Sequence, residues 1–395
     1  MTDHLDNKRR LHAGLARLAA AGPDGAAVML ANLYAPDADW RGAHPLNEMR
    51  GVEAIAARVW EPLLAACPDL ERRDLIVAGG AYEGRDYVAT VGHYCGTLTR
   101  DWIGIPATGR PVWLRYGEVH QLRDGRIVQS SCLWDVLDLI RQVGLWPLAP
   151  SLGAEGMWPG PITGDGLLLA PTDLAQSAAS LAQALAMQGT LGAFRDQVDA
   201  GRDALLSMPQ RGHWHPRMMW YGPSGIGTTR GLSGFVDHHQ LPFRNAFPNR
   251  KGGQHYIRIG DGPISVTGGW PSVTATHTGG GFLGLGPTGR RVGMRVMDFY
   301  LHHEGLIREN WVPLDILDLL MQMGVDVLAR MRAQIGRWPR SEIAPPHVRA
   351  NSPRAVRRAP RAASFAFPSH LLFLLFLLFL PAISGSAWGD HTGFG

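Results

Sequence analysis

Residues 135–144 read DVLDLIRQVG, and residues 315–324 read DILDLLMQMG. This repeat reveals the domain organisation of the chain. The two stretches lie 315 − 135 = 180 residues apart. The same offset pairs Trp40 with Trp220, Gly42 with Gly222, Arg50 with Arg230, Gly104 with Gly284, Gly109 with Gly289, Arg115 with Arg295 and Gly125 with Gly305. Because one register extends from position 40 to position 144, the pattern indicates duplication of a complete domain and not a short solenoid repeat.

Each copy is predicted to begin with helices and continue as an antiparallel meander. Apolar residues at helical spacing predict helices over 5–20 and 52–66 in the first copy and 172–188 in the second. Strand patterns bounded by turn residues cover 74–79, 86–98, 111–123 and 126–134. Asp124-Gly125 predicts a hairpin turn, and Gly144 suits the end of a short helix. We therefore expect an α+β domain, with the sheet curled over the helices.

Four segments follow from the repeat and the composition. We expect domain 1 over 1–146, a Gly/Pro/Trp-rich linker over 147–171, domain 2 over 172–336 and a low-complexity tail over 337–395. Because most soluble oligomers are symmetric assemblies of identical copies, fusion of two copies predicts an intramolecular pseudo-dimer in place of a homodimer.

Charge and cysteine content narrow the class of protein. The net charge is +4, but seven arginines from Arg337 onward oppose only Glu342 and Asp390, so the rest of the chain carries 4 − 5 = −1. A nearly neutral body argues against a nucleic-acid partner. The three cysteines lack metal-site spacing, and residues 1–10 contain no apolar signal segment. We therefore expect a cytoplasmic protein with reduced thiols.

The tail contains the run LLFLLFLLFL at 371–380. A membrane span needs about 20 apolar residues, and this run reaches Ile383 only across Pro381. A disordered extension is the favoured interpretation, and a membrane-surface anchor assisted by the preceding arginines is the alternative. For the body of the chain no membrane association is expected.

Three features in order resemble the SnoaL-like polyketide cyclase family of the nuclear transport factor 2-like superfamily. They are the Thr-Gly-Arg segments at 108–110 and 288–290, the acidic-Gly hairpins, and a strand that runs into Asp-x-x-Asp-Leu-x-x-Gln-x-Gly. The resemblance implies a cone-shaped α+β barrel with one apolar pocket. It also implies cyclase or isomerase chemistry by an acidic residue, without cofactor or metal, on a small apolar carbonyl compound in polyketide metabolism, as in the ester cyclases. Fold alone leaves the function open, because the superfamily also contains pure binding modules.

The first catalytic candidates are Asp135 and Asp315, which match the acid/base position of the family motif. A carboxylate in a dry pocket has a raised pKa and can move a proton alpha to a carbonyl. An aspartate before a helix is equally a plain N-cap, and the sequence does not separate the two interpretations.

The second candidates are Glu118 and Asp298. Period-two alternation places each acid on an otherwise apolar strand face. On a pocket-lining face such an acid would be catalytic, and the alternative is a structural ion pair with a basic neighbour. Arg115 and Arg295 fall on the opposite face and are poor partners.

Histidines supply further candidates. His93 and His277 could orient a substrate carbonyl or relay a proton, although structural histidines are as common. Under the 180-residue offset, His277 falls opposite Thr97. The adjacent pair His238 and His239 invites a metal interpretation, but neighbouring positions point apart, so no metal site is predicted.

Aromatic and polar residues near these acids are candidates for substrate binding. They are Trp311, Tyr300, His120, Trp40, Trp220 and Tyr221. Trp311 shares a period-two phase with Asp315 and could keep its carboxylate dry, whereas the first copy has Ser131 at that position. The second copy is therefore the preferred active copy. The competing function is a non-catalytic double module that holds a small ligand.

Overall fold

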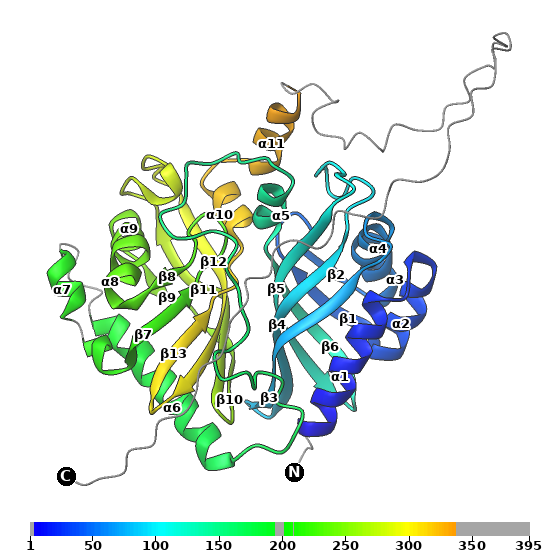
Figure 1. Cartoon of the computed structure of the whole chain (residues 1–395), viewed down its shortest axis with the longest axis horizontal. Helices are drawn as coiled ribbons and strands as arrows, with labels where there is room; N and C mark the ends of the chain where they lie inside the picture. The colour runs from blue at the N-terminus through cyan, green and yellow to red at the C-terminus, as the bar shows by residue number, and fades with distance from the viewer. Residues whose placement is uncertain (1–3, 194–200, 208, 337–395) are drawn as a thin grey trace, which may run out of the picture. The chain divides into compact units, whose positions relative to one another are not determined.

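The computed structural model describes residues 4–193, 201–207 and 209–336. Both copies have the same architecture and fall within one compact unit. The tail from 337 onward, with its Leu/Phe run, lies outside the described residues. Figure 1 shows helices against one face of a curved sheet in each copy.

The first copy has a six-stranded sheet ordered β2-β1-β6-β5-β4-β3. Neighbouring strands are antiparallel except β1 and β6, which are parallel. The strands are β1 (Tyr34–Gly42), β2 (Glu48–Arg50), β3 (Glu71–Tyr82), β4 (Arg85–Thr97), β5 (Pro111–Arg123) and β6 (Arg126–Trp134). The helices are α1 (His4–Ala19), α2 (Ala26–Leu33), α3 (Val52–Ile55), the π-helical turn η2 (Ala56–Trp60), α4 (Glu61–Ala66) and α5 (Val136–Gln142). A short 3-10 turn, η1, spans Pro23–Gly25.

The second copy repeats this order around a seven-stranded sheet. The sequence β10-β11-β12-β13-β7-β8 runs across it, and β9 pairs with β11. The strands are β7 (Trp214–Tyr221), β8 (Thr229–Arg230), β9 (Lys251–Gly252), β10 (His255–Asp261), β11 (Ile264–Thr276), β12 (Arg291–His303) and β13 (Leu306–Trp311). The helical elements are α6 (Leu174–Ala193), α7 (Arg202–Leu206), η3 (Pro209–Gly212), α8 (Gly231–Phe235), the π-helical turn η4 (Val236–Gln240), α9 (Leu241–Ala246), η5 (Phe282–Gly284), α10 (Ile316–Gln322) and α11 (Val327–Ile335).

The turn residues act as their sequence predicts. Asp124 and Gly125 both have positive φ, 53° and 70°, as a two-residue hairpin turn requires. Gly144, with φ 87°, ends the turn after α5. The α+β architecture, with helices against a mainly antiparallel sheet, is therefore confirmed. The sequence patterns did not predict helices α2, α7 and α11 or strands β1 and β2.

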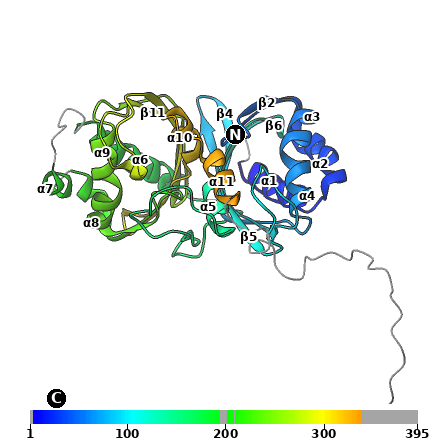
Figure 2. The same cartoon turned by 90° about the horizontal axis from the view of Figure 1, so that it is seen from above.

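The sheets of the two copies pack on each other through the faces that their helices leave uncovered. Strand β10 contacts β3, and a shared apolar cluster draws on both copies. Its members include Ile76, Ala78, Val91, Leu133, Ile257, Ile259, Val266, Phe299 and Trp311. Figure 2 shows the same arrangement from above, with strands between two outer groups of helices. Each copy therefore keeps its other sheet face, toward its own helices, for a separate interior.

A buried ion pair joins the copies at the edge of this layer. Lys8 Nζ lies 2.7 Å from Asp261 Oδ2, and the two residues are 3% and 4% exposed. Asp261 also accepts hydrogen bonds from the Gly79 amide and the Thr172 hydroxyl. The charge of each partner is thus compensated inside the protein.

The linker between the copies is ordered along this layer. Val77 bridges to Leu167 in parallel, and Ala154 bridges to Thr228 in antiparallel. Trp158 is buried and donates its indole N–H to the Gly222 carbonyl at 3.1 Å. The segment therefore packs against both copies.

The 180-residue offset fails along one strand. Tyr87 pairs with Gln121 and Ile264 with Leu301, so the offset there is 264 − 87 = 177. A bulge between Gly269 and Val273 then restores two residues, because Tyr94 corresponds to Val273 and 273 − 94 = 179. His277 consequently corresponds to Leu98, not to Thr97 as the constant offset predicts. The Leu98 amide donates a hydrogen bond to the Arg110 carbonyl, and the His277 amide donates to the equivalent carbonyl of Arg290.

In the part of the chain that the structure describes, no helix has the length and apolar character needed to cross a membrane.

Candidate functional site

Each copy carries an acid at the same position of the sheet face that its own helices cover, and the first copy has a second acid there, Asp74, which pairs with Arg72 and accepts from the Tyr116 hydroxyl. Glu118 on β5 and Asp298 on β12 share this face with apolar core residues, as the alternation predicts. Glu118 is 1% exposed, whereas Asp298 is only partly buried. The two acids occupy equivalent positions, 298 − 118 = 180, but their surroundings differ.

In the first copy, Glu118 is fully engaged. Its Oε2 lies 2.7 Å from Arg72 Nη1, and its Oε1 accepts hydrogen bonds from the Tyr94 hydroxyl at 2.9 Å and the Trp134 indole at 2.8 Å. Burial alone would raise the pKa of Glu118. The Arg72 guanidinium and a hydrogen bond from His120 outweigh burial, so its pKa lies below the usual value. This acid is held as a carboxylate in a structural ion pair.

Large rings fill the rest of that interior. The ring centroids of Trp60 and Trp134 lie 5.7 Å apart, and those of Tyr94 and Tyr116 lie 4.7 Å apart. The Arg72 guanidinium lies 4.3 Å from the Tyr116 ring centre. Trp60, Tyr94, Tyr116 and Trp134 are each at most 3% exposed. The first copy therefore has a closed, packed interior.

The second copy lacks these filling groups. Arg72 pairs with Tyr94, and the equivalent pair in copy two is Gly252 with Val273, so a glycine replaces the arginine. The equivalent substitutions at the other filled positions are Trp60 to Gln240, Trp102 to Phe282, Tyr116 to Val296 and Trp134 to Leu314. On β12, Val296 and Asp298 are both partly exposed although they face the helices. Solvent therefore reaches the inner face of copy two where copy one is sealed.

Asp298 has polar but uncharged neighbours. The Asn310 amide lies 3.5 Å from its Oδ1, and Gln188 of α6 donates to Tyr300 at 3.1 Å and to Thr267 at 2.8 Å. Among the described residues, no Lys, Arg or His lies within ion-pair distance of Asp298. Desolvation raises the pKa of Asp298 from 3.8 to about 6, and hydrogen bonds from Asn310 and Tyr300 oppose that rise. A carboxyl group with a pKa close to neutrality can both accept and return a proton.

Asp135 and Asp315 occupy a different place, where the two copies meet. Each caps its own helix, because Oδ1 accepts from the amide three residues on, at 3.0 Å. The Oδ2 atom of Asp135 accepts from the Ser224 amide at 2.8 Å, and that of Asp315 accepts from the His44 amide at 2.9 Å. These two amides are themselves 180 residues apart. Both interactions therefore join one copy to the other in a pseudo-symmetric way.

Arginines from the outer sheet faces complete this junction. Arg115 lies 2.6 Å from Asp135, and Arg295 lies 3.0 Å from Asp315. Burial raises the pKa of Asp135, and it raises that of Asp315 to about 6, while the arginines oppose the rise. The contacts are those of a helix cap and of an inter-copy contact, the second interpretation that the sequence left open. A catalytic role for either aspartate stays a prediction.

The two candidate histidines lie away from Asp298. His93 is on the outer face of β4, with its ring 5.6 Å from that of Trp113, and burial lowers its pKa to about 4. His277 ends β11 and contacts the Phe247 ring at 5.2 Å, and burial lowers its pKa also. Thr276, which precedes His277, pairs with Arg291 of β12. Asp298 lies seven positions further along the same strand, roughly 23 Å away. Neither histidine can share a substrate atom with Asp298.

The substrate-binding candidates divide between the two sheet faces. Trp40, His120, Trp220 and Tyr300 lie on the inner faces, whereas Tyr221 and Trp311 lie in the cluster between the copies. His120 bonds Ser130 at 2.7 Å and lies 3.4 Å from Glu118. Trp311 is fully buried and donates to the Pro159 carbonyl, so it does not face the interior that holds Asp298. These binding assignments stay predictions, and the structure favours Trp220 and Tyr300.

Sequence reasoning overlooked several residues of this interior. Asn310 and Gln188 hold the groups around Asp298, and His239 stacks on Trp220 with ring centroids 4.1 Å apart. One signal was available, because the 180-residue offset pairs Arg72 with Gly252 and shows that the second acid has lost its cation. No sequence signal links Gln188 to this site, because it lies on α6, 112 residues before Tyr300 in the chain.

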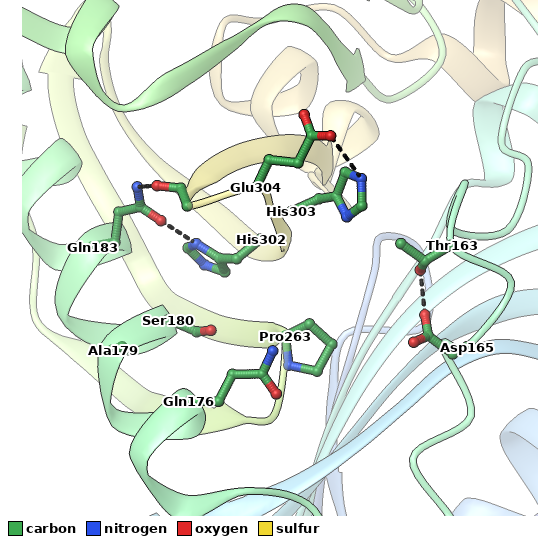
Figure 3. A pocket seen from close by; sticks show the side chains of 11 residues that line it. Thr163, Asp165, Gln176, Ala179, Ser180, Gln183, Pro263, His302, His303 and Glu304 are labelled. Carbon is green, nitrogen blue, oxygen red and sulfur yellow. Dashed lines mark hydrogen bonds and ion pairs between the residues drawn. The ribbon is translucent and has the colours of Figure 1, made fainter.

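A separate hollow lies at the hairpin end of copy two (Figure 3). It has a volume of about 540 Å³ and is lined by α6, the linker and the β12–β13 turn. His302 in its wall bonds Gln183 at 2.7 Å and Ser265 at 2.8 Å. The buried polar group of this hollow is thus satisfied by the protein. Within residues 4–193, 201–207 and 209–336, no group of three or more His, Cys, Asp or Glu is placed to hold a metal ion.

Comparison with known proteins matches each copy separately. The family model described as a SnoaL-like domain matches residues 15–130, and that described as SnoaL-like polyketide cyclase matches residues 209–323. No curated protein matches the chain.

Several solved structures resemble a single copy. A putative SnoaL-like polyketide cyclase from Jannaschia sp. CCS1 has 19% identity and a TM-score of 0.31, covering 35% of this chain and 92% of its own. IdmH, a putative polyketide cyclase from Streptomyces antibioticus, has 27% identity and a TM-score of 0.29, covering 34% and 98%. AclR, a putative hydroxylase from Streptomyces galilaeus, has 23% identity and a TM-score of 0.28, covering 34% and 96%.

The resemblance to SnoaL-like proteins that the motifs predict is confirmed for both copies by the two family matches, and the tandem α+β architecture is confirmed by the two sheets and their helices. The chain belongs to the SnoaL-like family and carries two copies of its domain.

Proposed function

We propose that this chain is a general acid/base catalyst of the aldol cyclase or isomerase type, that it acts on a small apolar carbonyl compound of polyketide metabolism, and that Asp298 of the second copy moves the proton. One observation carries the proposal. Asp298 is an acid on a partly open apolar face, without a described cationic partner, and its pKa is raised to about 6. Its equivalent in the first copy is sealed by Arg72.

The chemistry follows from the state of this carboxyl group. Above about pH 6, Asp298 is ionised and can remove a proton from the carbon beside a carbonyl, leaving an enolate. In an aldol closure the enolate carbon attacks a second carbonyl, and the carboxylic acid returns its proton to the new alkoxide. In an isomerisation the same proton returns to another carbon. In both cases Asp298 ends in its starting state.

The residues around Asp298 support a fixed carboxylate. Asn310 and Tyr300 offer hydrogen bonds to it, and Gln188 orients the Tyr300 hydroxyl. The interior beyond these groups is aromatic and apolar, with Trp214 and Trp220 buried beside Phe235. Such a wall suits a flat apolar ligand, which on binding would displace solvent from the carboxylate.

We further propose that the duplication divides the work between the copies. Arg72 and its aromatic neighbours make copy one a rigid support, and its outer sheet face covers that of copy two. The pair would then replace a homodimer by an intramolecular one.

The test is exchange of the alpha protons of 2-tetralone, an apolar bicyclic ketone, in D2O followed by ¹H NMR. We expect the native chain to exceed the buffer rate. Loss of a general base typically costs a factor of about 10² to 10⁴, so Asp298→Asn should approach the buffer rate. Glu118→Gln is the matched change in copy one. Under conditions in which this variant is folded, its rate of 2-tetralone proton exchange should equal that of the native chain.

Two outcomes would count against the proposal. Equal exchange by the native chain and by Asp298→Asn would remove Asp298 from the chemistry. Binding of 2-tetralone without any exchange would instead indicate the non-catalytic ligand-binding module.

A further inference from the structure

A row of aromatic rings extends through the interior of copy two along α8, η4 and α9. Neighbouring ring centroids lie 4.1 to 5.7 Å apart along the row. Its members are Trp214, Phe235, Trp220, His239, Phe243, Phe247 and His277. The rings of the first copy instead converge on Trp134 beside Glu118.

Ring nitrogens in this row are buried without hydrogen-bond partners among the described residues. They are Nε1 of Trp214, Nδ1 of His239 and Nε2 of His277. Trp214 is 5% exposed and His277 is fully buried. A buried polar atom without a partner costs free energy, so native proteins keep few of them away from functional sites. Indole nitrogens of Trp60 and Trp102 in the packed first copy also lack partners, so the histidine nitrogens are the distinguishing atoms of this row, and they point to a missing partner outside the protein.

His239 is the member placed to meet a ligand that also reaches Asp298. Its ring stacks on Trp220, and Trp220 pairs with Asn310 across β7 and β13. Asn310 in turn contacts Asp298. The His239 residue is partly exposed, but its Nδ1 atom is buried without a partner. The equivalent residue of the packed first copy is Val59, which has no polar atom.

We propose that Nδ1 of His239 binds a ring hydroxyl group of a planar ligand held in copy two. This inference rests on the proposal that copy two is the ligand-binding copy. The stacks on Trp220 and on Phe243, with centroids 4.1 and 5.6 Å away, fix the plane of the imidazole. A flat ring lying along the row would present its edge to Nδ1.

The protonation state of the imidazole suits this contact. Burial, with a smaller contribution from Arg244, lowers the pKa of His239 to about 3, so the ring is neutral at physiological pH. A neutral imidazole offers one donor and one acceptor nitrogen. A hydroxyl group can serve either, because it both donates and accepts.

The experiment compares two probes of similar shape, 2-naphthol and 2-methylnaphthalene, by titration against intrinsic tryptophan fluorescence at pH 7.5. One hydrogen bond should favour 2-naphthol by about three- to tenfold in Kd for the native chain. His239→Phe keeps an aromatic ring and removes the nitrogen, so the preference should fall to about onefold. His238→Ala, an exposed change in the same turn, should leave the preference unchanged.

Asp298→Asn separates this proposal from the catalytic one. If the preference survives Asp298→Asn and is lost in His239→Phe, the hydroxyl partner is His239. If it is lost only in Asp298→Asn, or if the native chain shows none, the proposal is overturned. Tetralone exchange tests the catalytic role independently, so either proposal can fail while the other stands.

A measurement on the native chain tests the same contact without any substitution, so it does not depend on whether the variants fold. With ¹⁵N-labelled histidine, the Nδ1 resonance of His239 should shift on addition of 2-naphthol and stay unchanged with 2-methylnaphthalene. An unchanged resonance at saturating 2-naphthol would overturn the assignment.

Discussion

Replacing Asp298 with asparagine should make the folded chain more stable above about pH 6, although it should remove the proposed activity. The reason is that the folded protein holds this carboxyl group in surroundings that disfavour its charge. Its pKa rises from 3.8 to about 6, mainly because of desolvation. Between these two values the unfolded chain loses its proton first, so folding becomes less favourable as the pH rises.

The size of the effect follows from the shift. About two pKa units at 1.36 kcal/mol each give an upper value of about 3 kcal/mol. Asp298 is partly exposed, so solvent screening reduces this, and we expect Asp298→Asn to gain about 1–2 kcal/mol at pH 7.5. Near pH 4 the folded chain is protonated at Asp298 and the unfolded chain is only about half ionised there, so the gain should be small, and it should approach zero only below about pH 3.

Glu118→Gln is the matched control with the opposite sign. The pKa of Glu118 is lowered, so its charge stabilises the fold above the unfolded-state pKa, and that contribution is lost only as the pH falls through the folded-state value. Its removal leaves Arg72 buried beside fewer acceptors. We expect a loss of about 3 kcal/mol at pH 7.5, in the range for breaking a buried ion pair.

The assay is urea unfolding of the full chain and both variants at pH 4.5, 6.0 and 7.5, followed by tryptophan fluorescence and circular dichroism. Comparing each variant with the native chain cancels the titration of other groups, such as Asp315. If Asp298→Asn lost more than about 1 kcal/mol at pH 7.5, Asp298 would be stabilised as a charge, and the reasoning from an unpaired acid would be refuted.

Two further predictions concern the same carboxyl group and the contact between the copies. Exchange of 2-tetralone protons should fall about tenfold per pH unit below about pH 6, because only ionised Asp298 accepts a proton; a flat pH–rate profile from 4.5 to 7.5 would contradict this. Lys8→Met should destabilise the chain by about 3–5 kcal/mol in urea unfolding at pH 7.5, because Asp261 is then left buried without its cation; a loss below about 1 kcal/mol would show that the pair is not needed.

Patterns local in the chain indicated four strands of the first sheet, its hairpin turn and most of its helices. The alternation along 111–123 correctly placed Glu118 on the inner face, and the Asp-Gly turn correctly marked the hairpin at 124–125. A constant offset of 180 residues did not identify the equivalent residues along β11, however. The hairpin before it is shorter, and the bulge after Gly269 adds residues back. The motifs on either side of β11 keep the 180-residue spacing, so they do not reveal these local deletions and insertions.

The roles of the acids depended on contacts between distant residues. Asp135 and Asp315 precede helices in the sequence, but only the folded chain shows that their second oxygen atoms accept amides from the other copy. In the same way, Arg72 lies 46 residues from Glu118 and reaches it only across the sheet.

The repeat, the alternation and the turn residues established the duplication, most of the strands and helices and the face on which Glu118 and Asp298 lie, because periodicity and turn chemistry act over a few residues. Only the tertiary structure decided which acid is neutralised and which is not. A pKa is set by every charge and apolar group packed around the carboxyl, and those neighbours include Asn310 of β13 and Tyr300, which Gln188 of α6 contacts.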